Sequence, residues 1–321
     1  MNTPLIETRN LKKYFKTPKG MLHAVDGVDL AIAGGTTLGV VGESGCGKST
    51  LGRTILRLID PTSGEILYNG SDIATLSEKK LVHLRREMQI IFQDPFSSLN
   101  PRMSVRDIIA EPIRVCKLCA ASADLSKRVE QLMDTVGLAR RFENAYPHEL
   151  DGGRRQRIGI ARALSLNPEF IVCDEPVSAL DVSIQAQILN LMQDLQDELG
   201  LTYMFITHNM SVVKHISNNI MIMYLGNMVE FADAQEIFKN RLHPYTKALL
   251  AAVPIPAIIE GRKRQLLTGE ITSPINPKPG CRFASRCPYA TAPCHEVDPT
   301  LAEVMPGHFV ACHNVKEINQ L

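Results

Sequence analysis

The segment that most constrains the fold is Gly42-Glu43-Ser44-Gly45-Cys46-Gly47-Lys48-Ser49, which fits the pattern G-x-x-x-x-G-K-[ST]. It follows the mainly apolar residues 37–41, which predict a buried strand, and it precedes a predicted helix. The glycines let backbone N–H groups curve around a phosphate, and the helix N-terminus adds the positive end of its dipole. Lys48 would then reach the β- and γ-phosphates, and the Ser49 hydroxyl would bind Mg²⁺. The sequence therefore predicts a P-loop.

A second segment supplies carboxylates. Residues 170–173 are apolar and predict a buried strand, which ends at Asp174-Glu175. Asp174 at the strand end would face the Mg²⁺ shell, and Glu175 would orient or deprotonate an attacking water. An Asp-Glu pair after a strand is commonly only the start of a loop. Its position after a P-loop, ahead of Ser178-Ala179-Leu180-Asp181, favours the functional interpretation.

The rest of the chain alternates predicted strands and helices. Residues 11–38 predict short, mostly antiparallel strands, and residues 203–206 and 220–224 predict two more core strands. Helical spacing dominates residues 105–164. A further amphipathic helix carries one apolar stripe, made of Ile184, Ile188, Leu191, Leu195 and Leu199. This alternation indicates an α/β fold with a mainly parallel sheet.

Composition excludes several classes of function. The chain has 35 basic and 34 acidic residues, and this near-neutral balance argues against nucleic acid as the main partner. The longest apolar run is about twelve residues, whereas a membrane-spanning helix needs about twenty. The first residues lack a hydrophobic secretory core, so we expect a cytoplasmic protein. Its eight cysteines are then expected to be buried residues or metal ligands before disulfides.

Together these motifs resemble the ATPase subunit of an ABC transporter over nearly the whole chain. The resemblance rests on the P-loop, residues 170–175, Gln93, Leu150-Asp151-Gly152-Gly153-Arg154, Ser178-Ala179-Leu180-Asp181 and His208. It implies a P-loop NTPase core with an antiparallel β subdomain, a helical subdomain at about 95–165 and a small C-terminal extension. We expect the ATPase domain to span residues 1–238 and the extension residues 239–321.

The resemblance also implies roles for single residues. Adenine would stack on Phe15 or Tyr14, and the phosphates would contact Gly42, Ser44, Gly45, Cys46, Gly47, Lys48, Ser49 and Thr50. Mg²⁺ would be held by Ser49, Gln93 and Asp174. The catalytic groups would be Glu175, His208 at the γ-phosphate, and Gln93, which would also contact the membrane partner. Each ATP would lie between the P-loop of one subunit and the signature helix of a second.

The signature segment departs from the family pattern Leu-Ser-Gly-Gly-Gln, because Asp151 replaces the serine and Arg154 the glutamine. Gly152 and Gly153 are retained. A carboxylate cannot donate a hydrogen bond to a γ-phosphate. At about 4 Å and an effective dielectric of about 20, it would repel each phosphate charge by about 4 kcal/mol before compensation. Arg154 could offset part of this repulsion. Alternatively, Asp151 is simply a good helix N-cap.

An intact P-loop half and an impaired signature half predict a heterodimer. In a homodimer both sites would carry the altered signature. A partner ATPase with a regular signature would complete one competent site on this chain's P-loop. We therefore expect a second, related ABC ATPase subunit as the partner.

Further segments resemble oligopeptide and dipeptide importer ATPases. They are Arg241-Leu242-His243-Pro244-Tyr245-Thr246-Lys247-Ala248-Leu249, Asp94-Pro95-Phe96-Ser97-Ser98-Leu99-Asn100-Pro101, and Gly280-Cys281-Arg282-Phe283 with Arg286-Cys287-Pro288. This branch includes importers of peptides and of nickel. The resemblance implies two transmembrane permease subunits, an extracytoplasmic solute-binding protein and a peripheral position at the cytoplasmic face of the membrane. A less favoured alternative is a soluble ABC-type protein that acts on nucleic acid or the ribosome.

Four cysteines follow in the C-terminal extension: Cys281, Cys287, Cys294 and Cys312. Their spacings fit neither a short ferredoxin motif nor the paired C-x-x-C of a zinc ribbon, so spacing alone leaves metal binding open. The resemblance to peptide-importer ATPases implies that the four cysteines hold a [4Fe–4S] cluster with a structural role. Zinc is the alternative.

Overall fold

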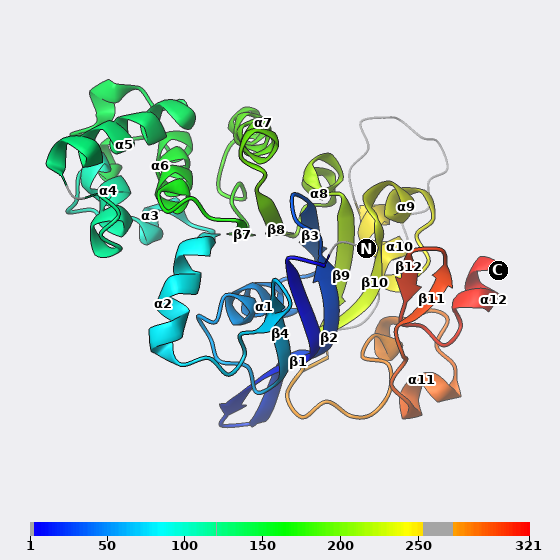
Figure 1. The fold of residues 1–321 in the computed structure, drawn as a ribbon. Helices are drawn as coiled ribbons and strands as arrows, with labels where there is room; N and C mark the ends of the chain where they lie inside the picture. Colours follow the sequence, from blue (N-terminus) through cyan, green and yellow to red (C-terminus); the bar gives the residue numbers. More distant parts are fainter. Residues whose placement is uncertain (1–2, 120, 253–271) are drawn as a thin grey trace. The chain divides into compact units, whose positions relative to one another are not determined.

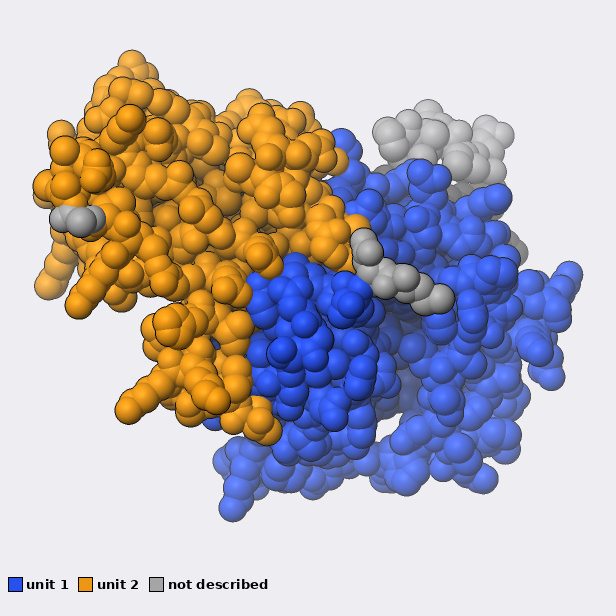
Figure 2. Space-filling model, in the orientation of Figure 1, with its two compact units in different colours: residues 1–32, 37–74, 205–321 blue, residues 33–36, 75–204 orange. Residues whose placement is uncertain are grey.

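The computed structural model of the protein describes residues 3–119, 121–252 and 272–321. The chain forms two compact units, which Figure 2 shows in blue and orange. The first unit contains residues 1–32, 37–74 and 205–321, and the second contains residues 33–36 and 75–204. The predicted boundary near residue 238 stays a prediction, since residues on both sides of it belong to the first unit.

An antiparallel sheet occupies the N-terminal part of the first unit, with strand order β2-β1-β4-β5 (Figure 1). The sequence predicts short strands here, but β1 and β2 are 12 and 13 residues long. Their register shifts at three places, among them the step from Lys13 to Tyr14. Such irregularities interrupt the alternation of apolar and polar residues while the strands continue. The strands are β1 Ile6–Thr17, β2 Gly20–Ile32, β4 Ser63–Tyr68 and β5 Ser71–Asp72.

The second group of strands in the first unit has the order β11-β12-β10-β9-β3. Strand β3 is fully buried and pairs with β9 in parallel, which confirms the strands predicted at residues 37–41 and 220–224. Strand β12 pairs with β10, so the C-terminal extension continues the sheet that carries the P-loop strand. The bounds are β3 Thr37–Val41, β9 Asn219–Tyr224, β10 Asn227–Asp233, β11 Ala302–Met305 and β12 His308–Val310.

Short helices complete the first unit. Three buried aromatic rings connect these helices to the strands. The ring centroid of Tyr224, in β9, lies 4.8 Å from that of Tyr245 and 5.2 Å from that of Phe283. Tyr245 belongs to α10, and Phe283 directly precedes the 3₁₀ turn at Ala284–Arg286. The helices are α1 Lys48–Ile55, α8 Met210–Ile216, α9 Ala234–Lys239, α10 Pro244–Ala252, α11 Ala292–Glu296 and α12 Val315–Asn319, with a 3₁₀ turn, η3, at Ala284–Arg286.

The second unit contains two parallel strands, β6 and β7, and most of the long helices. Strand β7 confirms the prediction at residues 170–173, and α7 confirms the amphipathic helix. The predicted stripe on α7 is partly wrong: Leu199 is 54% exposed, and the fully buried residues are Ile188, Leu189, Met192 and Leu195. The bounds are α2 Glu78–Glu87, β6 Met88–Ile91, α3 Pro95–Ser98, α4 Val105–Val115, α5 Ser122–Thr135, η1 Arg140–Phe142, η2 Pro147–Glu149, α6 Gly152–Leu164, β7 Phe170–Asp174 and α7 Val182–Leu199. Strand β8, Thr202–Thr207, contains the sequence position where one unit ends and the other resumes.

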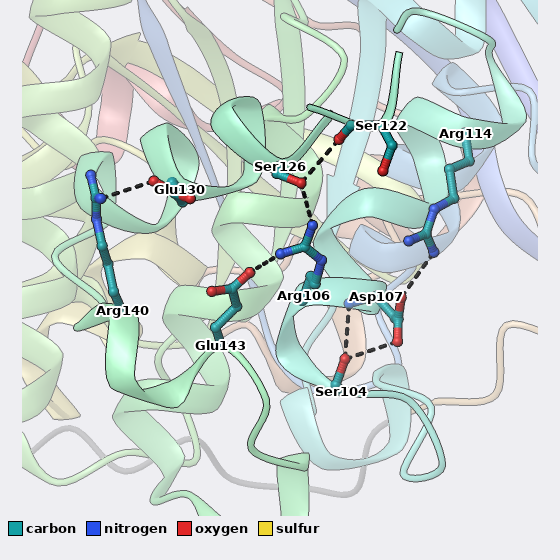
Figure 3. A network of polar contacts seen from close by, with 9 residues as sticks. All are labelled: Ser104, Arg106, Asp107, Arg114, Ser122, Ser126, Glu130, Arg140 and Glu143. Atoms are coloured by element: carbon teal, nitrogen blue, oxygen red, sulfur yellow. Dashed lines mark hydrogen bonds and ion pairs between the residues drawn. The ribbon is translucent and has the colours of Figure 1, made fainter. Parts of the chain in front are cut away.

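Polar contacts hold the helices of the second unit together (Figure 3). Ser104 caps α4, since its hydroxyl accepts a hydrogen bond from the Asp107 backbone N–H. Arg106, one residue into the helix, donates to Ser126 of α5 and to Glu143. One arginine therefore connects three segments that are separated in the sequence.

No helix in the described ranges combines the length and the hydrophobicity that crossing a membrane requires.

Candidate functional site

The backbone of the predicted P-loop requires glycine at two positions. Gly47 precedes α1 with φ of 105°, a left-handed backbone, and a Cβ atom there would lie 2.0 Å from the carbonyl oxygen of Ala24. A Cβ atom at Gly42 would lie 2.2 Å from the carbonyl oxygen of Met223. Both neighbours are backbone atoms, which cannot rotate away. The neighbouring strands β2 and β9 therefore hold the loop so closely that only glycine fits.

Lys48 carries the positive charge of the loop. Its side chain is only 5% exposed, and Nζ donates to the carbonyl oxygens of Gly42 at 2.7 Å and Glu43 at 3.0 Å. The ammonium is thus held inside the curve of the loop. No side chain caps the N-terminus of α1, so the dipole of this helix adds to the positive potential. A buried ammonium next to an uncapped helix N-terminus suits a polyanion such as the phosphate chain of ATP.

The other residues expected to contact phosphate have different environments. Ser44 and Gly45 are exposed at the tip of the loop, and Ser49 and Thr50 are half-buried in the first turn of α1. Cys46 is 2% exposed, and burial raises the pKa of its thiol. Its side chain therefore serves as packing, and only its backbone is available to a phosphate.

Tyr14 and Phe15 are adjacent on β1, so their side chains point to opposite faces of the strand. Tyr14 stacks on His23 with ring centroids 3.9 Å apart, and its hydroxyl donates to Asp26. Burial and the Asp26 carboxylate raise the pKa of Tyr14. Since His23 covers one face of the Tyr14 ring, only the other face could stack on adenine.

In the second unit, the structure brings Gln93 and Glu175 together. Strands β6 and β7 run in parallel with Ile91 opposite Cys173, and Gln93 and Glu175 each lie two residues beyond this pair. The Nε2 of Gln93 donates to Oε2 of Glu175 at 3.0 Å. Glu175 has φ of 48°, which turns the chain sharply after the buried Asp174. This geometry holds the Glu175 carboxylate at the end of the strand, and its role as general base stays a prediction.

The predicted Mg²⁺ ligands and catalytic residues are divided between the two units. Ser49 and His208 belong to the first unit, whereas Gln93, Asp174 and Glu175 belong to the second. Asp174 is 1% exposed at the end of β7. The shared Mg²⁺ site and the role of His208, which is exposed after β8, stay predictions.

Asp151 acts as the N-cap of α6. Its Oδ1 accepts from the backbone N–H of Arg154 at 2.8 Å, and Oδ2 lies 2.6 Å from Nη1 of the same arginine. The two glycines of the signature segment are closely packed, because a Cβ atom at Gly153 would lie 2.8 Å from Ile184. The structure thus has the N-cap that the sequence allows, with Arg154 paired to the same carboxylate; repulsion of a γ-phosphate by Asp151 stays a prediction.

The four C-terminal cysteines influence one another electrostatically. Burial raises the pKa of Cys281 to about 11, and the neighbouring Cys294, Cys312 and Cys287 contribute to this rise. The backbone N–H of Cys281 also donates to the carbonyl of Cys294 at 2.8 Å. Over residues 3–119, 121–252 and 272–321, however, no three or more His, Cys, Asp or Glu side chains are arranged to hold a metal ion. The described residues therefore do not support the predicted cluster.

Sequence reasoning missed the side chains that surround Glu43 of the P-loop. The Glu43 carboxylate accepts two hydrogen bonds from Arg286, and its backbone N–H donates to the Tyr245 hydroxyl at 2.9 Å. Position 43 is unspecified in the P-loop pattern, and its partners lie more than 200 residues away. No local signal in the sequence identifies these contacts.

Comparison with known proteins identifies the family. Residues 25–178 match the ABC transporter family, and residues 229–294 match the C-terminal region of oligopeptide/dipeptide transporters. The putative oligopeptide transport ATP-binding protein YkfD of Bacillus subtilis (strain 168) is 53% identical over 97% of this chain and 95% of its own length. AppF, an oligopeptide transport ATP-binding protein of the same organism, is 52% identical over 96% of this chain and 97% of its own length.

Solved structures confirm the predicted fold class. The dimeric ATP-binding cassette MJ0796, in a post-hydrolysis state bound to ADP and Pi, superposes with a TM-score of 0.66 at 29% identity. The match covers 71% of this chain and 98% of the cassette. CbiO1 from Clostridium perfringens, part of the ABC transporter complex cbiONQ, gives the same TM-score at 27% identity, over 74% of this chain and 92% of its own. The chain therefore belongs to the ABC transporter ATP-binding proteins, in the branch that carries the oligopeptide/dipeptide transporter C-terminal region.

Proposed function

We propose that this protein is the ATP-hydrolysing subunit that powers import of di- or oligopeptides through a membrane permease. The observation that carries the proposal is sequence identity of about half, over nearly the full length, to oligopeptide transport ATP-binding proteins. The geometry of the P-loop supports the ATPase activity, because Lys48 is buried among backbone oxygens next to an uncapped helix N-terminus.

Each group has a chemical task in this proposal. Lys48 and the first turn of α1 bind the phosphates, and Ser49 and Asp174 would hold Mg²⁺, which neutralises charge on the phosphates. Glu175 orients the attacking water and accepts its proton. Gln93 fixes the Glu175 carboxylate through its hydrogen bond and would report the state of the site to the permease.

The partners follow from the same proposal. Two permease subunits would receive the motion, an extracytoplasmic protein would deliver the solute, and this chain would lie at the cytoplasmic face of the membrane. The second ATPase subunit would be a related chain with a serine at the position of Asp151. Its signature segment would complete the site on this chain's P-loop.

Two ATPase measurements test this assignment. Glu175→Gln in the assembled complex should reduce turnover by about a hundredfold or more, since it removes the base while preserving shape. The matched control is Glu198→Gln on the exposed side of α7, which should leave turnover unchanged. Equal turnover in the two variants would contradict the role of Glu175.

The heterodimer requires its own test. This chain alone should hydrolyse ATP far more slowly than the paired complex. Asp151→Ser should raise the activity of this chain alone, and it should barely alter stability because serine and aspartate cap helices equally well. Full activity of the unpaired wild-type chain would refute the heterodimer.

Stimulation by solute distinguishes peptide from nickel. Peptides with the binding protein should stimulate ATPase activity of the complex reconstituted in vesicles, and nickel should not. Stimulation by nickel alone would favour the nickel importer of the same branch. Release of the chain from membranes together with salt-sensitive binding to RNA would favour the soluble alternative.

We also propose that Cys281, Cys287, Cys294 and Cys312 are ligands of an iron–sulfur cluster. The support is the resemblance of the extension to that of peptide-importer ATPases, since the first three cysteines lie within the matched C-terminal region; the side chains of the described residues are not arranged as a metal site. Iron and sulfide analysis of protein purified without oxygen tests this proposal. One zinc per chain, or no metal, would refute it.

A further inference from the structure

The C-terminal extension reaches Glu43 of the P-loop at two places, Tyr245 of α10 and the short segment of residues 281–287. Arg286 in this segment is 8% exposed, and its Nη1 and Nη2 donate to the two carboxylate oxygens of Glu43 at 2.8 and 3.1 Å. Such a bidentate pair fixes direction as well as distance. Nη1 also lies 3.3 Å from the hydroxyl of the buried Tyr224. The arginine is therefore held in place on both sides.

Glu43 connects this contact to the phosphate-binding lysine. Its backbone carbonyl accepts the hydrogen bond from Lys48 Nζ at 3.0 Å, and its backbone N–H donates to Tyr245. The three polar groups of Glu43 thus bond to Lys48, to Tyr245 and to Arg286. A displacement of Glu43 would displace the carbonyl that orients the Lys48 ammonium.

Buried hydrogen bonds also hold the start of α10, where Tyr245 lies. Glu230 is fully buried and accepts from the backbone N–H groups of Leu242 and His243, at 2.8 and 3.1 Å, immediately before α10. His308 of β12 contacts the same carboxylate at 2.7 Å. The start of α10, and with it Tyr245, is therefore fixed to β10 and β12.

A second arginine of the segment reaches the other side of the predicted nucleotide site. Arg282 donates to Asp26 and to the carbonyl of Leu225. Asp26 in turn holds His23 at 2.9 Å and the hydroxyl of Tyr14. The same seven-residue segment is thus connected to the P-loop and to a predicted adenine contact.

The ion pair between Arg286 and Glu43 affects the charge that ATP meets at the P-loop. Glu43 is the only carboxylate within the eight-residue loop, and alone it would repel the phosphates. Arg286 neutralises it by direct pairing. We propose that Arg286 is a positioning residue that orients the P-loop through Glu43, so that the C-terminal extension sets the ATP affinity of this chain. The inference requires only that the P-loop binds ATP, and is independent of the transported solute.

Calorimetric titration of the full chain with ATP and Mg²⁺ tests the inference. Arg286→Gln should weaken ATP binding about tenfold, because it leaves the Glu43 carboxylate unpaired and removes the contact that holds the P-loop to residues 281–287. Arg286→Lys retains the charge and should recover part of the affinity. The matched control is Arg140→Gln, which breaks exposed ion pairs with Glu130 and Asp134 and should leave ATP affinity unchanged.

The double variant separates positioning from simple packing. Adding Glu43→Gln to Arg286→Gln removes the unpaired carboxylate, so the double variant should bind ATP more tightly than Arg286→Gln alone. Urea unfolding shows that each variant is folded under the conditions of the titration, so that the rescue reports the charge of the loop and not its folding. In the assembled ATPase, Arg286→Gln should raise the KM for ATP and leave kcat within about twofold, since Glu175 is unchanged.

Three results would overturn the inference: ATP affinity of Arg286→Gln within about twofold of wild type, absence of rescue in the double variant, or a fall in kcat without a change in KM. If Arg286→Gln does not fold, Tyr245→Phe provides the test, because it removes only the hydroxyl that accepts from Glu43. It should weaken ATP binding about threefold, and unchanged affinity would overturn the inference. A wild-type chain that does not bind ATP would overturn the proposed ATPase function as well.

Discussion

Gly47→Ala should destroy nucleotide binding for a reason that is visible in the backbone. The residue has φ of 105°, and left-handed backbone costs an alanine about 1–2 kcal/mol. In addition, the new Cβ atom would lie 2.0 Å from the carbonyl oxygen of Ala24. Non-bonded carbon and oxygen atoms need about 3.3 Å, so the loop and β2 would have to separate by more than about 1 Å.

That displacement falls on the residue before Lys48. We therefore expect ATP affinity to fall at least about a hundredfold, which corresponds to about 2.7 kcal/mol. Gly45→Ala is the matched control: its φ is also positive, at 78°, but nothing lies within 4 Å of its Cβ position. In Gly45→Ala the only unfavourable change is the left-handed backbone of an alanine, which costs about 1–2 kcal/mol, so ATP affinity should fall about tenfold or less.

Calorimetric titration with ATP gives the affinities, and urea unfolding shows that both variants are folded. Gly159→Ala in α6 completes the series, since its Cβ position is also open and its φ is not positive. It should stabilise the chain by about 0.5–1 kcal/mol. The reasoning is refuted if Gly47→Ala and Gly45→Ala reduce ATP affinity equally.

Two further predictions concern stability, both measured by urea unfolding. Burial lowers the pKa of His243 to about 4, against some opposition from Glu230, and its Nδ1 accepts a hydrogen bond from the Tyr245 backbone N–H. The unfolded chain binds a proton near pH 6.5 that the folded chain excludes, so stability should fall by about 2 kcal/mol from pH 7 to pH 5. His243→Asn should remove most of this slope, and an unchanged slope would contradict the prediction. Arg106→Ala breaks the half-buried contacts with Glu143 and Ser126 (Figure 3) and should cost about 1–2 kcal/mol. Arg114→Ala breaks the exposed pair with Asp107 and should cost under about 0.5 kcal/mol; equal losses would contradict the difference.

Local pattern predicts the strand–loop–helix unit of the P-loop because the signals for its strand, its turn and its helix follow one another directly in the sequence. Residues 37–41 are apolar, the glycines follow, and Lys48 starts the helix. The same holds for β7 and the acidic residues after it. The hydrogen bond between Gln93 and Glu175 is not among the sequence predictions; it depends on the parallel register of two strands that are distant in the sequence.

Long-range contacts could not be predicted in the same way. Leu199 fits the helical stripe of α7, yet it lies at the last residue of the helix, where the chain turns at Gly200 and leaves it exposed. Strand β12 has only three residues, and two of them pair with β10. Arg286 and Glu43 are 243 positions apart, and charge alone cannot select this pair among 35 basic and 34 acidic residues.

The central claim is that the buried ammonium of Lys48 binds the phosphates of ATP. Calorimetric titration of the full chain with ATP and Mg²⁺, comparing Lys48→Ala with wild type, tests it most directly. Lys316→Ala, on the exposed side of α12, is the matched control. The account predicts saturable binding by wild type and control, and a loss of at least about a hundredfold for Lys48→Ala. Equal ATP affinity in all three proteins would contradict it.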